Sequence, residues 1–219
     1  GAISALGVFE KDIALAVSKK VKQQLELQLG ATVALTRASD RLVHLSDRVS
    51  WANSRKPDAF LSIHANSMPT DRLRASTEGI ETYFLSASAS DENARRVAAR
   101  ENAELGFGNR RSKKNTLAYI LADLQKSEAH ADSSRLAYAL HRALVRESRA
   151  VDRGVQQAPF YVLMGLQAPA VLIEIGFISN PDEGRRLGDS AYQDKLAQAI
   201  AQGFKEFWVQ IHSRDLRAP

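Results

Sequence analysis

Three side chains stand where a packed element begins or ends, and together they could bind a metal ion and move a proton. Glu10 opens a helical pattern, His64 ends the apolar run AFLSIHA, and Glu174 lies within VLIEIGF. Sites in α/β proteins gather at strand ends and helix starts. Imidazole and carboxylate are zinc ligands, and a carboxylate near a water molecule can act as a general base.

Each of these residues also has an ordinary structural explanation. Glu10 can be a first-turn acid that the helix dipole favours, and His64 can be a buried histidine with satisfied hydrogen bonds. Glu174 is harder to explain in this way, because a carboxylate among apolar side chains is costly to bury without a compensating charge. A buried ion pair with an arginine is its structural alternative.

The composition limits the available chemistry. The chain has 219 residues, is 44% hydrophobic and 25% charged, and contains no cysteine. We therefore expect one globular α/β domain without disulfides, thiolate nucleophiles or cysteine-rich zinc sites. No apolar run approaches the roughly 20 residues of a membrane span, and the first residues lack the pattern of a secretory signal. The net charge of +5 suits an anionic partner, but the basic residues are interleaved with acids, so nucleic acid ranks last.

The hydrophobic periodicity predicts the elements that position these residues. Apolar spacings of three and four predict helices at 11–29, 46–55, from Ser90, near 117–124, near 136–144 and at about 190–211. Apolar and β-branched runs predict strands at 32–37, 59–65, 79–85, 160–164 and 170–175. This order predicts an α/β fold with a mostly parallel, mixed central sheet and helices on both faces. Residues 86–154 show three helical patterns without a convincing strand, which predicts a helical insertion.

Six segments carry a resemblance to a known family: EKDIALAVSKK, VALTRASDRLVHLSDRVSWAN, DAFLSIHAN, GIETYFL, FYVLMGLQAPAVLIEIGFISNPDE and the closing helix. In order and spacing they resemble the zinc-dependent N-acetylmuramoyl-L-alanine amidases of bacterial cell-wall metabolism. The resemblance implies a zinc-exopeptidase-like fold, a single catalytic domain over 1–219, and cleavage of the amide bond between N-acetylmuramic acid and L-alanine of peptidoglycan. It implies one zinc ion held by Glu10 and His64, with Glu174 as the catalytic carboxylate.

The resemblance also implies a mechanism and one difference from the family. Zinc would polarise the scissile carbonyl and lower the pKa of a water molecule toward roughly 7, and Glu174 would pass that water's proton to the departing alanine nitrogen. Family members carry a further histidine ligand on a preceding strand, of which only the end matches Gly1-Ala2-Ile3. We therefore expect the domain to be incomplete at its N-terminus, with a further histidine upstream of Gly1, and the chain as given to bind metal poorly. No motif supports a substitute among His44, His130, His141 and His212.

A glutamate in the predicted insertion suggests autoinhibition. Glu101 falls within the apolar stripe of the helix that begins at Ser90, and ARENAEL resembles a helix of division-type family members whose glutamate can plug the zinc site. The resemblance implies that Glu101, or the less well placed Glu104, is an inhibitory ligand that an activator protein displaces during daughter-cell separation, in the periplasm or outside the cell. The structural alternative is an ion pair of Glu101 with Arg95 or Arg100.

Two other functions remain open at this point. A non-catalytic cell-wall binding module would keep the fold and lose the chemistry. A zinc carboxypeptidase would share the metal site, but it would also need a cationic pocket for a free carboxylate.

Overall fold

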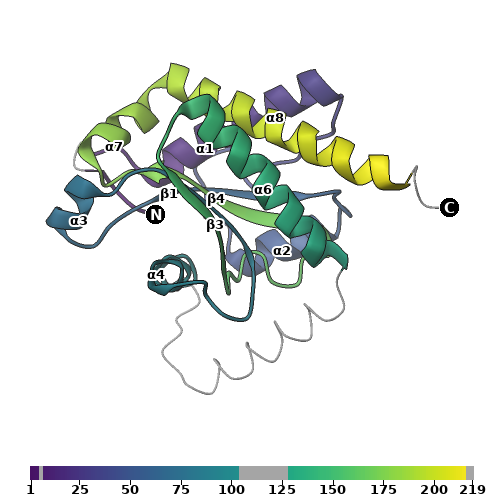
Figure 1. Ribbon diagram of the computed structural model, residues 1–219, viewed down its shortest axis with the longest axis horizontal. Helices are drawn as coiled ribbons and strands as arrows, with labels where there is room; N and C mark the ends of the chain where they lie inside the picture. Colours follow the sequence, from purple (N-terminus) through teal and green to yellow (C-terminus); the bar gives the residue numbers. More distant parts are fainter. Residues whose placement is uncertain (5–6, 104–127, 216–219) are drawn as a thin grey trace.

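Strands and helices alternate along most of the computed structural model, which describes residues 1–4, 7–103 and 128–215 (Figure 1). In chain order the elements are α1 (Glu10–Leu29), α2 (Leu45–Asn53), β1 (Phe60–Asn66), α3 (Asp71–Ser76), β2 (Ile80–Leu85), α4 (Glu92–Glu101), α6 (Glu128–Ser148), β3 (Asp152–Ala158), β4 (Ala170–Phe177), α7 (Pro181–Gly188) and α8 (Ser190–Asp215). Within these ranges no helix combines the length and apolarity that crossing a membrane requires.

The four strands form one mixed sheet in the order β1-β4-β2-β3. β1 runs parallel to β4, and β2 runs parallel to β3, whereas the two central strands β4 and β2 are antiparallel. The predicted α/β fold with a mixed sheet is confirmed. All residues of β4 are buried, as expected for a central strand that is covered on both faces.

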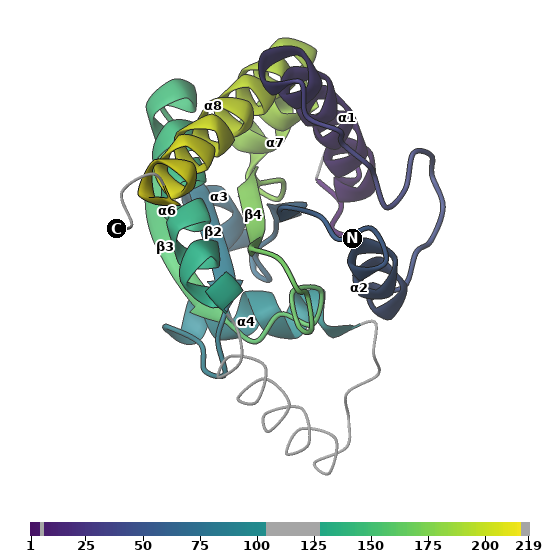
Figure 2. The same cartoon turned by 90° about the vertical axis from the view of Figure 1, so that its right-hand side faces the viewer.

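The alternation of side chains along β4 explains why helices cover both faces of the sheet. Val171 and Ile173 pack into an apolar layer with α1, α6 and α8, whereas Leu172 packs into a second layer with α2 and α4. Figure 2 shows α6 and α8 on one side of the sheet and α4 on the other. The face toward α4 is the one that carries the candidate site.

Helix α1 presents its first residue to that site. The apolar side chains Ile13, Val17, Val21 and Leu25 recur at every fourth position and form its buried stripe. Gly30 ends the helix in the left-handed conformation, with φ 62°, which glycine adopts without the steric cost of a side chain. The predicted first helix is therefore confirmed.

Close helix packing supports the first layer. A Cβ atom on Gly203 of α8 would lie 2.7 Å from Leu140 Cα and 2.9 Å from Ala139 O of α6. Glycine therefore sets the distance between these two helices. Leu136, Leu140 and Leu144 of α6 are fully buried, so the third helical pattern of residues 86–154 belongs to the core.

Two predicted strands are wrong. Residues 32–37 have no strand assignment; their apolar pattern arises because Ala31 and Val33 pack against the first layer, and Lys22 donates to the Val33 carbonyl at 2.5 Å. Residues 160–164 form turns instead, in which Phe160, Val162 and Leu163 are buried and the Leu163 N–H donates to Phe160 O at 3.1 Å.

One strand was missed, and one helical pattern lies outside the structure's description. β3 has the polar sequence DRGVQQA and is mostly half-buried, because it is an edge strand. The expectation that residues 86–154 hold no strand is therefore wrong at their end. The helical pattern near 117–124 falls outside the described residues.

Candidate functional site

Three ionisable side chains lie in one row across the sheet. His64 of β1 is the register partner of Glu174 of β4, and Glu174 is in turn the partner of Glu81 of β2. Paired residues of neighbouring strands point to the same face, which here is the face toward α4. The sheet itself therefore gathers an imidazole and two carboxylates.

Glu10, His64 and Glu101 form a cluster whose ligand atoms all lie within 4.8 Å of one another. His64 Nδ1 is 3.0 Å from Glu10 Oε1 and 2.9 Å from Glu101 Oε2. On the other side of the ring, Nε2 is 3.0 Å from Ser62 Oγ, a contact that fixes the orientation of the imidazole. One nitrogen and two carboxylate oxygens suit a zinc ion. The residues present therefore fit a metal centre.

Backbone groups hold the Glu10 carboxylate in place. Oε2 accepts a hydrogen bond from the Ala2 N–H at 2.7 Å, and Oε1 accepts one from the Ala65 N–H at 3.4 Å. A Cβ atom on Gly1 would lie 2.9 Å from Oε2. Glu10 is only 5% exposed, so its carboxylate is fixed by residues at the start of the chain, at the head of α1 and at the end of β1.

Glu174 is fully buried beside this cluster. Its Oε1 accepts a hydrogen bond from Arg100 Nη2 at 3.1 Å, so the ion pair considered as its structural alternative is present. Its Oε2 has no hydrogen-bond partner among the described residues. One oxygen of this carboxylate is therefore held by a cation, and the other is free to accept a proton.

Burial and charge shift the ionisation of the site. Burial raises the pKa of Glu174 well above its usual range, although the Arg100 charge opposes this shift. Burial alone would lower the pKa of His64, but the Glu101 charge and the hydrogen bond that His64 donates to Glu10 raise it well above its ordinary value. Burial would also raise the pKa of Glu101, but His64 and Arg100 lower it to about 2. His64 and Glu101 therefore form a charged pair.

The pKa of Glu10 follows the same balance. Burial would raise it, but the hydrogen bond and the charge of His64 bring it below its ordinary value. The two carboxylates that face His64 are therefore both anionic, as ligands of a divalent cation must be.

Arg100 connects the carboxylates to the end of β1. Besides Glu174, its guanidinium donates to Glu101 Oε1 at 2.8 Å, to Asn66 Oδ1 at 2.7 Å and to Ser67 O at 3.0 Å. Glu101 thus contacts both His64 and Arg100, so the ion pair with Arg100 considered for this residue is present. The Arg100 contact was anticipated only as an alternative, because sequence alone does not place α4 over β4.

The sequence analysis did not identify Glu81, which is 1% exposed. Both oxygens of its carboxylate accept hydrogen bonds. Oε1 accepts from Asn93 and from Arg153, each at 2.8 Å; Oε2 accepts from Asn66 at 2.9 Å and from the Tyr83 hydroxyl at 2.8 Å. The signal was available, because Glu81 interrupts the apolar strand GIETYFL as Glu174 interrupts VLIEIGF.

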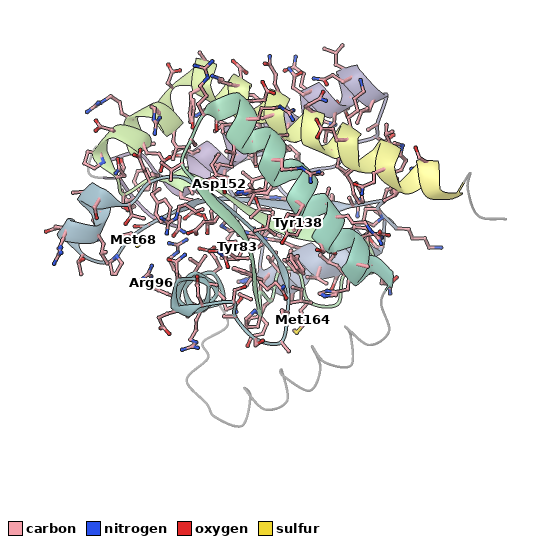
Figure 3. All side chains as sticks on the ribbon, in the orientation of Figure 1. Met68, Tyr83, Arg96, Tyr138, Asp152 and Met164 are labelled. Atoms are coloured by element: carbon pink, nitrogen blue, oxygen red, sulfur yellow. The ribbon has the colours of Figure 1, made fainter. Side chains whose placement is uncertain are left out.

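Helix α4 is held over the site by polar contacts near both of its ends. Asp91, rather than the expected Ser90, caps the helix by accepting from the Ala94 N–H at 2.7 Å. Asn102 donates to Pro159 O at 2.7 Å and accepts from the Tyr161 N–H at 2.9 Å. Midway, Arg96 Nη2 lies 3.2 Å from Met68 Sδ (Figure 3). Glu104, the second inhibitory candidate, lies outside the described residues.

The remaining histidines lie outside the cluster of Glu10, His64 and Glu101. His141 is buried between Thr82 Oγ1 at 3.1 Å and Asp152 Oδ1 at 2.8 Å, where it links α6 to β2 and β3. His44 precedes α2, and His212 bonds the Trp208 carbonyl on α8 at 2.9 Å.

A groove of about 1740 Å³ opens from the cluster. Its lining includes Glu10, His64 and Glu101, together with residues 29–37 and the β1 segment 60–64. In the described part of the chain β1 pairs only with β4. The other edge of β1 therefore faces this groove with its backbone groups available.

Comparison with known proteins gives a consistent result. The sequence profile of the family described as N-acetylmuramoyl-L-alanine amidase matches residues 1–206. N-acetylmuramoyl-L-alanine amidase AmiA of Escherichia coli (strain K12) is 34% identical over 206 residues, which cover 93% of this chain and 70% of AmiA. YqiI, an uncharacterised protein of Bacillus subtilis (strain 168), is 34% identical over 204 residues, which cover 93% of this chain and 77% of YqiI.

A solved structure agrees with these sequence matches. The N-acetylmuramoyl-L-alanine amidase of Clostridium difficile 630 superposes with a TM-score of 0.71 at 26% identity, covering 95% of this chain and 89% of that protein.

Proposed function

Because the chain belongs to the N-acetylmuramoyl-L-alanine amidase family and is an amidase of peptidoglycan, we propose that it cleaves the bond between N-acetylmuramic acid and L-alanine with one zinc ion. Glu10 and His64 would hold the ion. The observation that carries this proposal is the convergence of these two side chains beside the buried carboxylate Glu174. The absence of cysteine leaves imidazole and carboxylate as the protein ligands.

The chemistry divides between the ion and the carboxylate. When bound, zinc supplies a Lewis acid that polarises a carbonyl and lowers the pKa of water from 15.7 to about 7. Glu174 Oε2, which has no partner in the described residues, is the atom proposed to accept the proton of the attacking water. Because its burial raises the pKa of Glu174, the carboxyl can then return this proton to the departing alanine nitrogen.

We further propose that a histidine on an extended segment supplies another ligand. Catalytic zinc sites ordinarily have three protein ligands, and Glu10 and His64 provide two. The groove lined by residues 29–37 and the open edge of β1 is also lined by this pair, so a strand lying there would reach the ion. This location is consistent with the expected ligand upstream of Gly1.

Glu101 is proposed to inhibit the enzyme. Its Oε2 lies 2.9 Å from the same His64 nitrogen that faces Glu10, so it would occupy a ligand position that water and substrate need. An activator protein that draws α4 away would open the site. The corresponding cellular role is daughter-cell separation in the periplasm or outside the cell.

Product analysis tests the activity. Zinc-loaded protein is incubated with purified peptidoglycan, and the expected products are stem peptides with a free N-terminal L-alanine and glycan with unmodified N-acetylmuramic acid. A chelator should abolish their release. Release of a C-terminal amino acid from the stem peptide would instead identify a carboxypeptidase. Binding without any release, by wild type and by Glu101→Gln alike, would identify a binding module.

A further inference from the structure

We infer that Arg100 is a second blocking residue beside Glu101, so that α4 masks the buried carboxylate Glu174 as well as the metal ligands. The inference rests on the proposed function. One turn of α4 would then obstruct the site in two ways: Glu101 obstructs the proposed metal ligands, and Arg100 obstructs the proposed general base.

The contacts of the two neighbouring residues divide in this way. Glu101 faces His64 at 2.9 Å, whereas Arg100 Nη2 faces Glu174 Oε1 at 3.1 Å. Glu174 is fully buried, but the Arg100 side chain keeps 30% exposure, so Arg100 reaches into the site from the surface side. Among the described residues, Arg100 is the only cation paired with Glu174.

An ion pair of this kind weakens a general base. A guanidinium beside a carboxylate favours its charged form and lowers its affinity for a proton. It also fixes the carboxylate in one orientation through charge-assisted hydrogen bonds. One oxygen of Glu174 is therefore held in the ion pair. As long as Arg100 remains in place, the carboxylate is a weaker proton acceptor.

The two blocks are released together because they share a backbone. Arg100 and Glu101 are adjacent at the C-terminal end of α4, and the Arg100 Nε–H also donates to Glu101 Oε1 at 2.8 Å. A movement of this turn away from the sheet removes the carboxylate from His64 and the guanidinium from Glu174. Release of the metal site and release of the base are then one event.

Substitutions in a Glu101→Gln background isolate the second block. This parent keeps Arg100 but removes the charge of the first block. Adding Arg100→Gln is expected to raise kcat on purified peptidoglycan about tenfold, about 1.4 kcal/mol in activation free energy, with KM changed less than about threefold. Arg100→Lys keeps a cation beside Glu174 and is expected to give a smaller increase. Arg95→Gln, on the same helix and paired with exposed Glu92, is the matched control and should equal the parent.

The outcomes separate this inference from the proposed function. A zinc-loaded parent without amidase activity would overturn both. An active parent whose kcat stays unchanged or falls on adding Arg100→Gln would overturn the inference alone, since Arg100 would then be neutral or helpful in the active arrangement. An equal effect of Arg100→Lys and Arg100→Gln would also overturn it, because the positive charge would not be the cause.

Thermal unfolding of the metal-free chain provides a readout that does not depend on activity. Arg100→Gln leaves a buried carboxylate without its cation, so it should lower Tm more than Arg100→Gln/Glu174→Gln, in which both partners are neutral. The Tm change of Arg100→Gln/Glu174→Gln is compared with the sum of the changes of Arg100→Gln and Glu174→Gln. If the two are equal, Arg100 and Glu174 do not interact, and the inference is overturned.

Discussion

His64 Nδ1 and Glu101 Oε2 lie 2.9 Å apart, although one belongs to the end of β1 and the other is the last residue of α4. Glu10 Oε1 approaches the same nitrogen at 3.0 Å. The first residue of α1 and the last residue of α4 therefore approach the same nitrogen atom. Proposed metal binding and proposed control by α4 both involve this imidazole.

Removing the Glu101 carboxylate should activate the enzyme. Glu101→Ala is expected to raise basal hydrolysis of purified peptidoglycan by about tenfold or more, corresponding to at least about 1.4 kcal/mol, because the metal ligands lose a competing carboxylate. Glu92→Ala, at the exposed start of α4, is the control. The rate is measured as release of soluble stem peptide that carries no muramic acid. Equal rates for Glu101→Ala and wild type would refute autoinhibition by this residue.

Removing a proposed ligand should weaken metal binding. We expect Glu10→Gln and His64→Ala to lower zinc affinity by more than about 100-fold, since even residues that only support ligands cost 10–100-fold when mutated. Competition with a chromophoric chelator measures the Kd. His44→Ala serves as the control because His44 is exposed ahead of α2. Unchanged affinity in either ligand variant would place the metal elsewhere.

Glu174→Gln should separate binding from catalysis. The amide preserves the shape of the side chain but cannot accept the proton, so kcat is expected to fall about 10²–10⁴-fold while zinc content stays at the wild-type value. Elemental analysis and product release are measured on the same samples. Retained activity in this variant would assign the base role to another group.

Glu183 of α7 should make stability depend on pH. Burial raises its pKa from 4.5 to about 7, against the hydrogen bonds from Phe177 N and Gly79 N. Between these two values the folded state binds more protons than the unfolded state, so the free energy of unfolding increases as pH falls from about 7 to about 4.5, and this contribution is lost as pH rises through 7.

Glu183→Gln should remove that contribution. The difference between wild type and variant across this pH window is expected to be on the order of 3 kcal/mol, measured by urea unfolding at several pH values. The control is Asp182→Asn, at the preceding residue, whose side chain is 82% exposed. Parallel pH profiles for wild type and Glu183→Gln would contradict the prediction.

Filling the contact between α6 and α8 should destabilise the fold. In Gly203→Val the Cβ would meet Leu140 Cα at 2.7 Å, and overpacking of this kind costs about 1–3 kcal/mol. Valine has a higher helix propensity than glycine, so propensity does not account for a loss, and Lys205→Val, at an exposed position of the same helix, shows the effect of a valine away from this contact. Chemical denaturation should show the larger loss for Gly203→Val; equal losses would mean that the helices can separate without cost.

Much of this arrangement follows from local patterns, and the rest depends on tertiary contacts. The stripe of α1 and the apolar runs of β1, β2 and β4 predicted their elements and placed Glu10 and His64 at ends that converge. The polar edge strand β3 has no apolar signal, and in residues 32–37 Val33 packs against the core although the segment does not pair as a strand. The pairing of Arg100 with Glu174 requires α4 to lie over β4, which no spacing in the sequence encodes.

The row of His64, Glu174 and Glu81 across three strands also constrains how the chain can fold. A slip of β4 by one residue would turn Glu174 into the apolar layer beneath α6 and α8 and bring isoleucine against the proposed metal ligands. Such a misaligned sheet would bury an uncompensated charge and remove the proposed base from the site. Strand alignment is thus tied to the proposed site, because a molecule with this misaligned sheet would lose both stability and the proposed catalytic carboxylate.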